Sequence, residues 1–418
     1  MSKTLMIKAM ALGAVACAFS ATGFAADVQN GHGQGIADSI TEVNGAKHEA
    51  VRSSWMDRTD VVVGVGMKDS KETHSQHHYV GESSMRHDDL NTVTSKSSKS
   101  TEINKLYIET LQPITHYDEN AKSVVFVQGR IGRSGEKISS RALNNYWVPA
   151  RPAGTFITHD KQTDKKESLG MNANIGIGYR RLSKGEHAYV GVNAFYDHVF
   201  KGGYKRVSGG VEYVAGLNEF HANLYRNLGT DDRKYIGLRG RSNVLGDPAG
   251  LYPYGLDSNQ GLFNYGVVSY ENHWMLSEKV AASGFDVGYS RTFKNARWAR
   301  VYADYYNWRG REAVRVGYHK LKKRDAIKGF KVGAEFHITP HLTLDAGYQT
   351  ASHHLSGPYA TLKYTIGTSK FAWHGGKHSE NAITTARSKM LDKVHRSDMV
   401  VQEVEEETYD HGVVDVGL

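Results

Sequence analysis

Hydrophobic and polar residues alternate one by one along much of this sequence. In "YVGVNAFYDHVF", residues 189–200, every second residue from Val190 to Tyr196 is apolar and would share one face of a strand. The residues between them, Gly191 to Asp197, would lie on the other face, because successive side chains of a strand point to opposite sides. The same period recurs in "FKVGAEFHI", "HLTLDAGYQ" and "PYATLKYTI". The pattern therefore predicts two-faced β-strands.

Repeated along the chain, this pattern predicts twelve strands. They cover residues 103–112, 121–131, 171–181, 187–197, 204–214, 218–228, 280–291, 297–308, 312–321, 330–338, 341–350 and 357–367. An even number of strands is what a single-chain antiparallel barrel needs in order to close. Most of the connections are short, but 132–170 and 229–279 are long.

The polar faces of these strands carry charged residues of both signs in mid-strand. These are Glu212, Arg300, Asp304, Arg315, Lys331, Glu335, Asp345 and Lys363. A soluble β-sandwich would alternate in the same way, with such residues on its solvated face. A water-filled, ion-paired lumen explains the mixing of signs better, and a mid-depth cation facing lipid would cost roughly 2–4 kcal/mol. The charges therefore favour a transmembrane β-barrel with this face inward.

Composition agrees with a barrel only in part. The 44 glycines and 24 tyrosines are typical of many short strands edged by interfacial aromatic residues. The mean hydropathy of −0.51, taken alone, would suit a soluble protein. Beyond the N-terminus no run of 18 residues is apolar, so no transmembrane helix is predicted, and a closed barrel is the remaining way to cross a membrane.

The first residues, 1–26, have the pattern of a secretory signal peptide, with two lysines, the apolar run "AMALGAVACAF" and the small-residue site "GFAAD". Cys17, the one cysteine, lies inside this signal, so the mature chain would form no disulfide. A lipoprotein signal ending at Cys17 is the alternative, but Ala14 stands where leucine is usual. The formal charge of +8 favours anionic lipid headgroups over nucleic acid as the partner of a secreted chain.

The remaining segments complete the predicted organisation. Residues 27–102 are polar and predict a periplasmic lead with one short strand at "DVVVGVGM", followed by the barrel at 103–370. Within 379–398, apolar residues at spacings of four predict one amphipathic helix. They are Ala382, Ala386, Met390 and Val394. We therefore expect a linker at 371–402 with a helix in the lumen, then an extended acidic tail at 403–418.

The charged positions of this linker would meet the mixed charges of the barrel wall. They are Arg387, Lys389, Asp392 and Lys393. The fold class expected is therefore all-β, an antiparallel transmembrane barrel of about twelve strands with a C-terminal helical linker in its lumen.

The segment "GYRRLSKGEHAYVGVNAFYDHVFKGGYKRVSGGVEYV", residues 178–214, resembles the central barrel signature of the intimin and invasin proteins, the inverse autotransporters. The residues of this family signature are Gly191, Phe195, Asp197, Arg206, Gly210, Glu212 and Tyr213. "LYIETLQPI", "SGFDVGYSRTF" and "ARSKMLDKVHRSDMVV" are similar as well, and together these stretches extend the resemblance over about 103–402.

The resemblance implies an outer-membrane barrel whose linker threads its own pore and leads outward to immunoglobulin-like domains that bind host cells or other bacteria. The match covers the barrel and the linker from Arg387 to Val401. The residues that follow are too few for an adhesion domain of roughly 100 residues. The expected function is an anchor and translocator that presents its own C-terminal segment, with outer-membrane lipids and the barrel-assembly machinery as partners and host-cell or bacterial surface ligands as candidates.

Two questions stay open at this point. A passive outer-membrane pore, with the C-terminal segment left in the periplasm, is the alternative function. In addition, the strand count places both long connectors on the same side as the two ends of the barrel, whereas outer-membrane barrels put long loops outside. Either one strand is miscounted, or these connectors are periplasmic.

Candidate chemistry is sparse, and no cofactor, metal or catalytic site is predicted. His77 with His78, and His353 with His354, are adjacent pairs that supply too few ligands for a tight zinc site. Asp197 and His198 at a strand end are the nearest candidates for a rim enzyme. No activated-serine motif such as G-x-S-x-G accompanies them.

Overall fold

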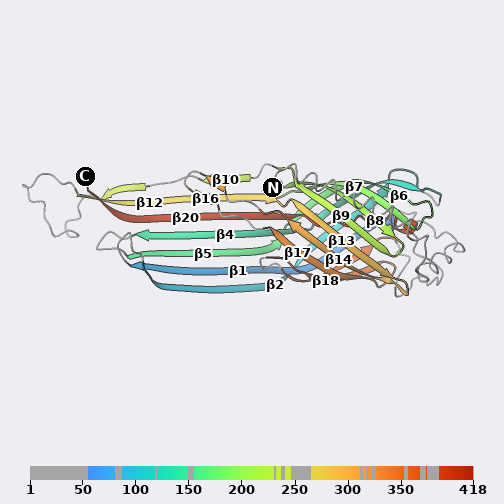
Figure 1. Cartoon of the computed structure of the whole chain (residues 1–418), viewed down its shortest axis with the longest axis horizontal. Helices are drawn as coiled ribbons and strands as arrows, with labels where there is room; N and C mark the ends of the chain where they lie inside the picture. Colours follow the sequence, from blue (N-terminus) through green and yellow to red (C-terminus); the bar gives the residue numbers. More distant parts are fainter. Residues whose placement is uncertain are drawn as a thin grey trace, which may run out of the picture. The chain divides into compact units, whose positions relative to one another are not determined.

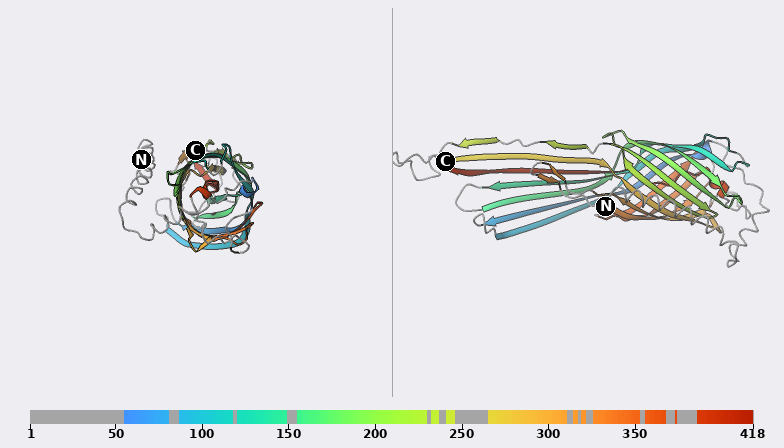
Figure 2. Two further views of the ribbon diagram at one scale, coloured as in Figure 1. Left: turned by 90° about the vertical axis from the view of Figure 1, so that its right-hand side faces the viewer. Right: turned by 45° about the horizontal axis from the view of Figure 1, so that its top comes forward.

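Among the residues that the structure describes, twelve antiparallel strands close into one ring, seen from the side in Figure 1 and along the barrel in Figure 2 (left). The computed structural model describes residues 55–80, 87–117, 120–148, 155–229, 232–236, 241–245, 265–310, 314–316, 319–321, 326–352, 356–367, 373 and 386–417. All of them belong to the unit formed by Ala50–His378 and Thr384–Leu418. The predicted signal at 1–26 lies outside the described residues.

The ring follows chain order, because each strand pairs with the next barrel strand along the sequence. Its strands are β1 (Thr59–Val80), β2 (His87–Pro113), β3 (Ser123–Arg133), β6 (Met171–Leu182), β7 (Ala188–Val199), β8 (Lys205–Ala215), β9 (Asn218–Asn227), β13 (Gly284–Phe293), β14 (Ala296–Trp308), β17 (Ile327–His337), β18 (Leu342–Gln349) and β19 (Gly357–Thr365). The antiparallel pairing of β1 with β19, from Asp60↔Thr365 to Val65↔Ala360, closes it.

Side chains alternate across the wall as the sequence predicts. On β7, Val190 and Val192 are 52% and 53% exposed on the outside, whereas Phe195 and Asp197 are 3% and 4% exposed. The other strands repeat this arrangement, so large apolar side chains cover the outer surface. They include Ile175, Ile177, Phe220, Leu224, Phe330, Val332 and Leu362. An apolar outer band around a polar interior is the arrangement of an outer-membrane barrel.

One predicted strand is wrong, and one barrel strand comes from the segment expected to precede the barrel. The described residues within 312–321 belong to no wall strand; β15 (Val314–Val316) and β16 (His319–Leu321) pair as a separate two-stranded sheet. The strand that completes the ring is β1. Its apolar start, "DVVVGVGM", lies in the wall, and its polar remainder continues past the barrel.

This exchange of one strand resolves the position of the long connectors. With β1 as the first strand, the ring begins and ends at one rim, which also carries the turns 183–187, 216–217, 294–295 and 338–341. We call it the turn rim. Both long connectors lie at the opposite rim, the extension rim, because each follows a strand that runs away from the turn rim.

The long connectors form strands that join the ends of β1 and β2 in an extension sheet (Figures 1 and 2). Its further strands are β4 (Glu136–Val148), β5 (Thr155–Ser168), β10 (Asp232–Ile236), β11 (Arg241–Leu245), β12 (Tyr265–Ala281) and β20 (Val400–Gly417). β1 pairs with β5 from Asp69 onward, and β5 pairs with β4. β20 then lies between β4 and β12, parallel to the first and antiparallel to the second.

The segment expected to be a pore helix is mostly extended. In the described part of 379–398, one 3-10 turn, η3 (Ala386–Lys389), is followed by chain without helix up to β20. Residues 379–385 lie outside the described residues. Another short turn, η2 (Met56–Arg58), precedes β1. None of the helices in the described part of the chain is long and apolar enough to span a membrane.

Candidate functional site

The interior of the barrel contains residues 386–399, which we call the lumen linker. In the view along the barrel (Figure 2, left) the lumen linker lies inside the ring of strands. It contacts the wall in chain order, first near the turn rim through Arg387 and last near the extension rim through Asp398. From there the chain continues directly into β20. The linker therefore passes through the barrel from one rim to the other.

At the turn rim an ion pair and an apolar cluster hold the start of the linker. The Arg387 guanidinium donates to both carboxylate oxygens of Glu186, at 2.9 and 2.6 Å, and to the carbonyl oxygen of Ala121 at 2.7 Å. Met390 is fully buried in a cluster with Leu111, Phe126 and other wall residues. The first turn of the linker is thus fixed by both polar and apolar contacts.

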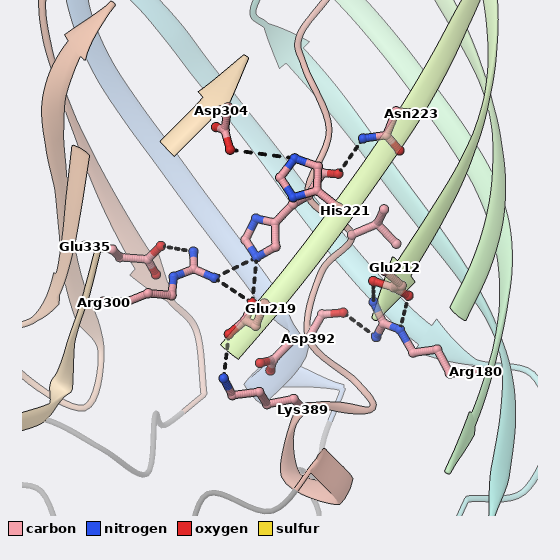
Figure 3. A network of polar contacts seen from close by, with 12 residues as sticks. Arg180, Glu212, Glu219, His221, Asn223, Arg300, Asp304, Glu335, Lys389 and Asp392 are labelled. Carbon is pink, nitrogen blue, oxygen red and sulfur yellow. Dashed lines mark hydrogen bonds and ion pairs between the residues drawn. The ribbon is translucent and has the colours of Figure 1, made fainter. Parts of the chain in front are cut away.

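Arg180 of β6 joins the wall to the linker backbone (Figure 3). It donates from Nε and Nη2 to the two carboxylate oxygens of Glu212, at 2.5 and 3.0 Å. Its Nη1 donates to the carbonyl oxygens of Met390 and Asp392, at 2.8 and 2.6 Å. The Arg180 side chain is fully buried and lies 4.6 Å from the centre of the Phe126 ring. A single guanidinium therefore neutralises a wall carboxylate and binds two linker carbonyls.

A second network crosses the lumen through Glu219 of β9 and Arg300 of β14 (Figure 3). Lys389 of the linker donates to Glu219 at 2.5 Å, and Arg300 pairs with the same carboxylate at 3.1 Å. Arg300 also pairs with Glu335 at 2.6 Å and contacts Nε2 of His395 at 2.7 Å. Two linker side chains thus enter an alternating row of acids and bases on the wall.

A third cluster lies on the β7–β8 hairpin, where the family signature places Asp197 opposite Arg206. Arg206 donates to Asp197 at 2.9 Å and to the carbonyl oxygens of Ser397 and Asp398, at 3.1 and 3.3 Å. The linker's Arg396 reaches the same Asp197 oxygen at 2.5 Å. One buried carboxylate is therefore shared by a wall arginine and a linker arginine.

Near the extension rim the linker supplies the acid and the wall the bases. The Asp398 carboxylate lies 2.7 Å from Nη1 of Arg130 and 3.4 Å from Nζ of Lys105. A further pair joins Lys393 to Asp60 of β1. The wall and the linker are complementary in charge at both places.

The structure brings together most of the charged residues expected in the lumen. Lys363 lies 3.4 Å from Glu335, and Asp304 lies 3.7 Å from His221. Asp345 accepts from the Tyr302 hydroxyl at 2.5 Å. Lys331 lies over the Tyr302 and Tyr359 rings, at 5.2 and 4.8 Å from their centres.

Arg315 is the exception among the expected wall residues. It belongs to β15, which is not part of the ring, so its expected place in the wall is wrong. Asp392 contributes its carbonyl oxygen to Arg180.

The other signature residues have separate roles. A Cβ on Gly191 would lie 2.4 Å from Oε1 of Glu212, so glycine leaves the space that this carboxylate occupies. Gly210 likewise faces the side chains of Asn223 and Asn193. The centre of the Phe195 ring lies 4.4 Å from Cζ of Arg396. The ring of Tyr213 instead stacks with that of Phe220, whose side chain is exposed on the outer surface.

Sequence reasoning missed several residues that join the wall to the linker, namely Arg180, Glu219 and Asp60 of the wall and Arg396 and Asp398 of the linker. Arg180 lies on the same, inward face of β6 as Gly176 and Gly178, two and four residues before it. This spacing could have placed Arg180 in the lumen from the sequence. Glu219 and Asp60 stand at the starts of strands, where the alternation is short. Arg396 and Asp398 lie on the linker, but the expected helix directed attention to other positions.

The two candidates for a rim enzyme do not lie together. Asp197 is buried in its ion pairs, whereas His198 stacks beside Tyr196 on the outer side, so the two lie on opposite sides of the wall. Within the described residues no group of three or more metal-binding side chains comes together. His353 and His354 lie outside those residues.

Comparison with known proteins gives one family. Residues 157–398 match the family model described as the inverse autotransporter beta-domain. The comparison with curated proteins found no match.

Solved structures show only a distant likeness. The translocator domain of the autotransporter NalP from Neisseria meningitidis is 10% identical over 82% of this chain and 97% of its own, with a TM-score of 0.23. The beta domain of the Bordetella autotransporter BrkA is 8% identical over 72% and 99%, with a TM-score of 0.20. A structure from work on in-meso crystallization of membrane proteins is 13% identical over 82% and 100%, with a TM-score of 0.44.

Proposed function

Since this chain belongs to the inverse autotransporters by its β-domain, we propose that its outer-membrane barrel carries its own C-terminal segment through the lumen and presents it at the cell surface. The anchoring part of this function follows from the family and the barrel. The export part is supported above all by the lumen linker, which runs between the rims with side-chain contacts along its length.

The arrangement of the two rims supports an outward direction of export. Outer-membrane barrels have short periplasmic turns and longer extracellular loops. Here the turns 183–187, 216–217, 294–295 and 338–341 share a rim with the start of β1 and the end of β19, and both long connectors share the rim from which β20 emerges. With the turn rim in the periplasm, β20 lies outside the cell.

Further parts of the proposal come from the sequence and the family. An N-terminal signal peptide at residues 1–26 takes the chain across the inner membrane, and the barrel-assembly machinery inserts it. Adhesion to host-cell or bacterial surface ligands is the role that the family suggests for the exported part.

A passive pore is the alternative, and it requires an open lumen. The described linker instead occupies the lumen and leaves beside it a cavity of about 250 Å³, whose lining includes Lys331, Asp304 and Arg396. The contacts of Arg180, Arg206 and Arg300 with the linker favour a closed barrel over a channel.

Conductance in a planar bilayer tests this directly. We expect the full chain to be nearly silent, because the lumen linker occupies the barrel. Deletion of 386–418 should open a steady conductance, whereas the control deletion of 403–418, which leaves the lumen linker in place, should stay silent. A full chain as conductive as the 386–418 deletion would favour the passive pore.

A further inference from the structure

We propose that the two long connectors of the extension rim form a receptor for an acidic β-strand, and that residues 400–417 of this chain are the strand it captures on leaving the lumen. The inference rests on the proposed function, because it describes what receives the exported segment. It also changes what is presented, since the segment becomes a fixed strand of a sheet rather than a free tail.

The receptor consists of two strand edges, one from each long connector. β4 belongs to the first connector and β12 to the second, and β20 lies between them (Figure 1). Val400–Gly412 pair in parallel with Glu136–Val148, and Val401–Gly417 pair antiparallel with Tyr265–Ala281. Adding a strand to an exposed sheet edge is a known mode of peptide recognition, in which backbone hydrogen bonds supply the affinity.

Capture begins where the lumen ends. The Glu136 amide, at the start of β4, donates to the carbonyl oxygen of Met399 at 3.0 Å. The Ala282 amide, directly after β12, donates to the carbonyl oxygen of Val400 at 2.8 Å. The last residue of the lumen linker and the first residue of β20 are therefore each bound by one side of the receptor. From this point the strand can pair residue by residue as it emerges.

Charge selects the strand that enters. Residues 400–417 contain six acidic residues and no lysine or arginine. Glu403, Glu405 and Glu407 share one face of β20, because they are two residues apart. Lys279 of β12 lies 3.8 Å from Glu403 and 3.5 Å from Glu405, and Lys137 of β4 lies 3.4 Å from Glu403.

The third glutamate has the closest contacts. Arg141 of β4 donates to Glu407 at 2.8 Å, and it lies 4.0 Å from Glu405. His273 of β12 lies 2.9 Å from the other Glu407 oxygen, and its ring stacks on Tyr409 at 4.2 Å between centres. Cations from both flanking strands therefore meet the same row of carboxylates.

At the start of β20, Val400 and Val401 are buried in two apolar clusters. From residue 402 to residue 408 the face opposite the glutamates is mostly polar. It carries Gln402, Glu406 and Thr408, which are polar although buried. Thr408 accepts a hydrogen bond from Asn144 of β4 at 3.4 Å. Beyond Val401, backbone pairing and the glutamate row therefore hold β20, and the glutamates meet their cations only in this register.

Disulfide formation in the full chain tests the capture. Cys17 is the one native cysteine. Val404 and Ser140 are direct partners, so V404C with S140C should cross-link on mild oxidation of outer membranes. The control, T408C with S140C, is displaced by four residues, roughly 13 Å along the strand. Cysteines with Cα atoms more than about 7 Å apart cannot bridge without movement of the backbone. Equal cross-linking of both pairs, or of neither, would overturn the receptor.

Charge variants test the selection. E403Q with E405Q and E407Q should slow cross-linking of the 140–404 pair several-fold, and so should R141E alone. R141E combined with E407R reverses the closest ion pair and should restore the rate. Cross-linking that is indifferent to all of these changes would overturn selection by charge, even if the pair itself forms.

An epitope tag after Leu418 keeps this inference separable from the proposed function. A tag that antibodies reach on intact cells, together with an absent 140–404 cross-link, would overturn the receptor and leave export standing. A tag reached only after permeabilisation would overturn export, and with it the capture of an exported strand.

Discussion

Buried arginines join the barrel wall to the linker by serving two kinds of partner at once. Arg180 binds the Glu212 carboxylate and two linker carbonyls, and Arg206 binds Asp197 and two more. The guanidinium suits this position because its five N–H donors are fixed in one plane and its charge is permanent. A lysine would offer a single point charge and could not span both partners.

Loss of Arg180 should loosen the linker and the wall together. In R180M, Glu212 remains buried without its counter-charge, and two linker carbonyls lose their donor. Breaking such a buried pair typically costs about 3–5 kcal/mol, and we expect a fall of that size in the free energy of unfolding in detergent.

The neighbouring R181M is a matched control for this prediction, because Arg181 is exposed on the outer side of the same strand. Its effect should stay within about 0.5 kcal/mol. Equal effects of the two substitutions would contradict the role of Arg180 in holding the linker.

Single residues also show what the alternation of the sequence can and cannot predict. It gives the face of the wall on which Glu212 or Arg300 lies, because parity along a strand fixes this. It does not give the partner, since Glu212 pairs with Arg180 from another strand, and Arg180 in turn binds the linker backbone from the far end of the chain. The space for that pair depends on Gly191, and the need for glycine at this position is evident only from the three-dimensional structure.

The prediction of whole strands and helices from the sequence has the same limit. The strand pattern predicted a short strand at the start of β1 but placed it before the barrel, because only this start lies in the wall and the rest of the strand is polar. The predicted helix failed for another reason. A helix would use the carbonyls of Met390 and Asp392 in its own backbone hydrogen bonds, whereas here Arg180 binds them. An extended linker leaves its backbone free for the wall.

The extension sheet should depend on pH through β20. Burial opposes ionisation of Glu407, but hydrogen bonds from Arg141, His273 and Tyr409 outweigh it and hold the pKa of this carboxyl below its ordinary value. A carboxyl with a lowered pKa in the folded state stabilises that state above its ordinary pKa, and loses this contribution as the pH falls through the lowered value.

We therefore expect the backbone amides of 400–409 to exchange with solvent faster at about pH 3 than at about pH 7, after correction for intrinsic rates. Hydrogen exchange followed by mass spectrometry measures this. In E407Q the difference between the two pH values should shrink. A protection of β20 that is the same at both pH values in the unmodified chain would contradict the role of Glu407.

At the scale of the whole molecule, one strand decides the direction of export that we propose. Counting 312–321 as a wall strand put the long connectors on the side of the chain ends, and replacing it with β1 puts them on the opposite side. The sequence could predict that the chain forms a barrel of twelve strands, because each strand carries its own pattern. It could not predict which rim carries the long connectors. Including 312–321 in place of β1 reverses the rim assigned to every loop between these two segments.

Antibody labelling of intact cells tests the direction of export most directly. Three epitope tags are compared, one after Leu418, one in the extension-rim turn 200–204 and one in the turn-rim turn 294–295. We expect the first two to be labelled on intact cells and the third only after permeabilisation. Labelling of the 200–204 tag on intact cells, with the tag after Leu418 reached only after permeabilisation, would contradict export through the lumen.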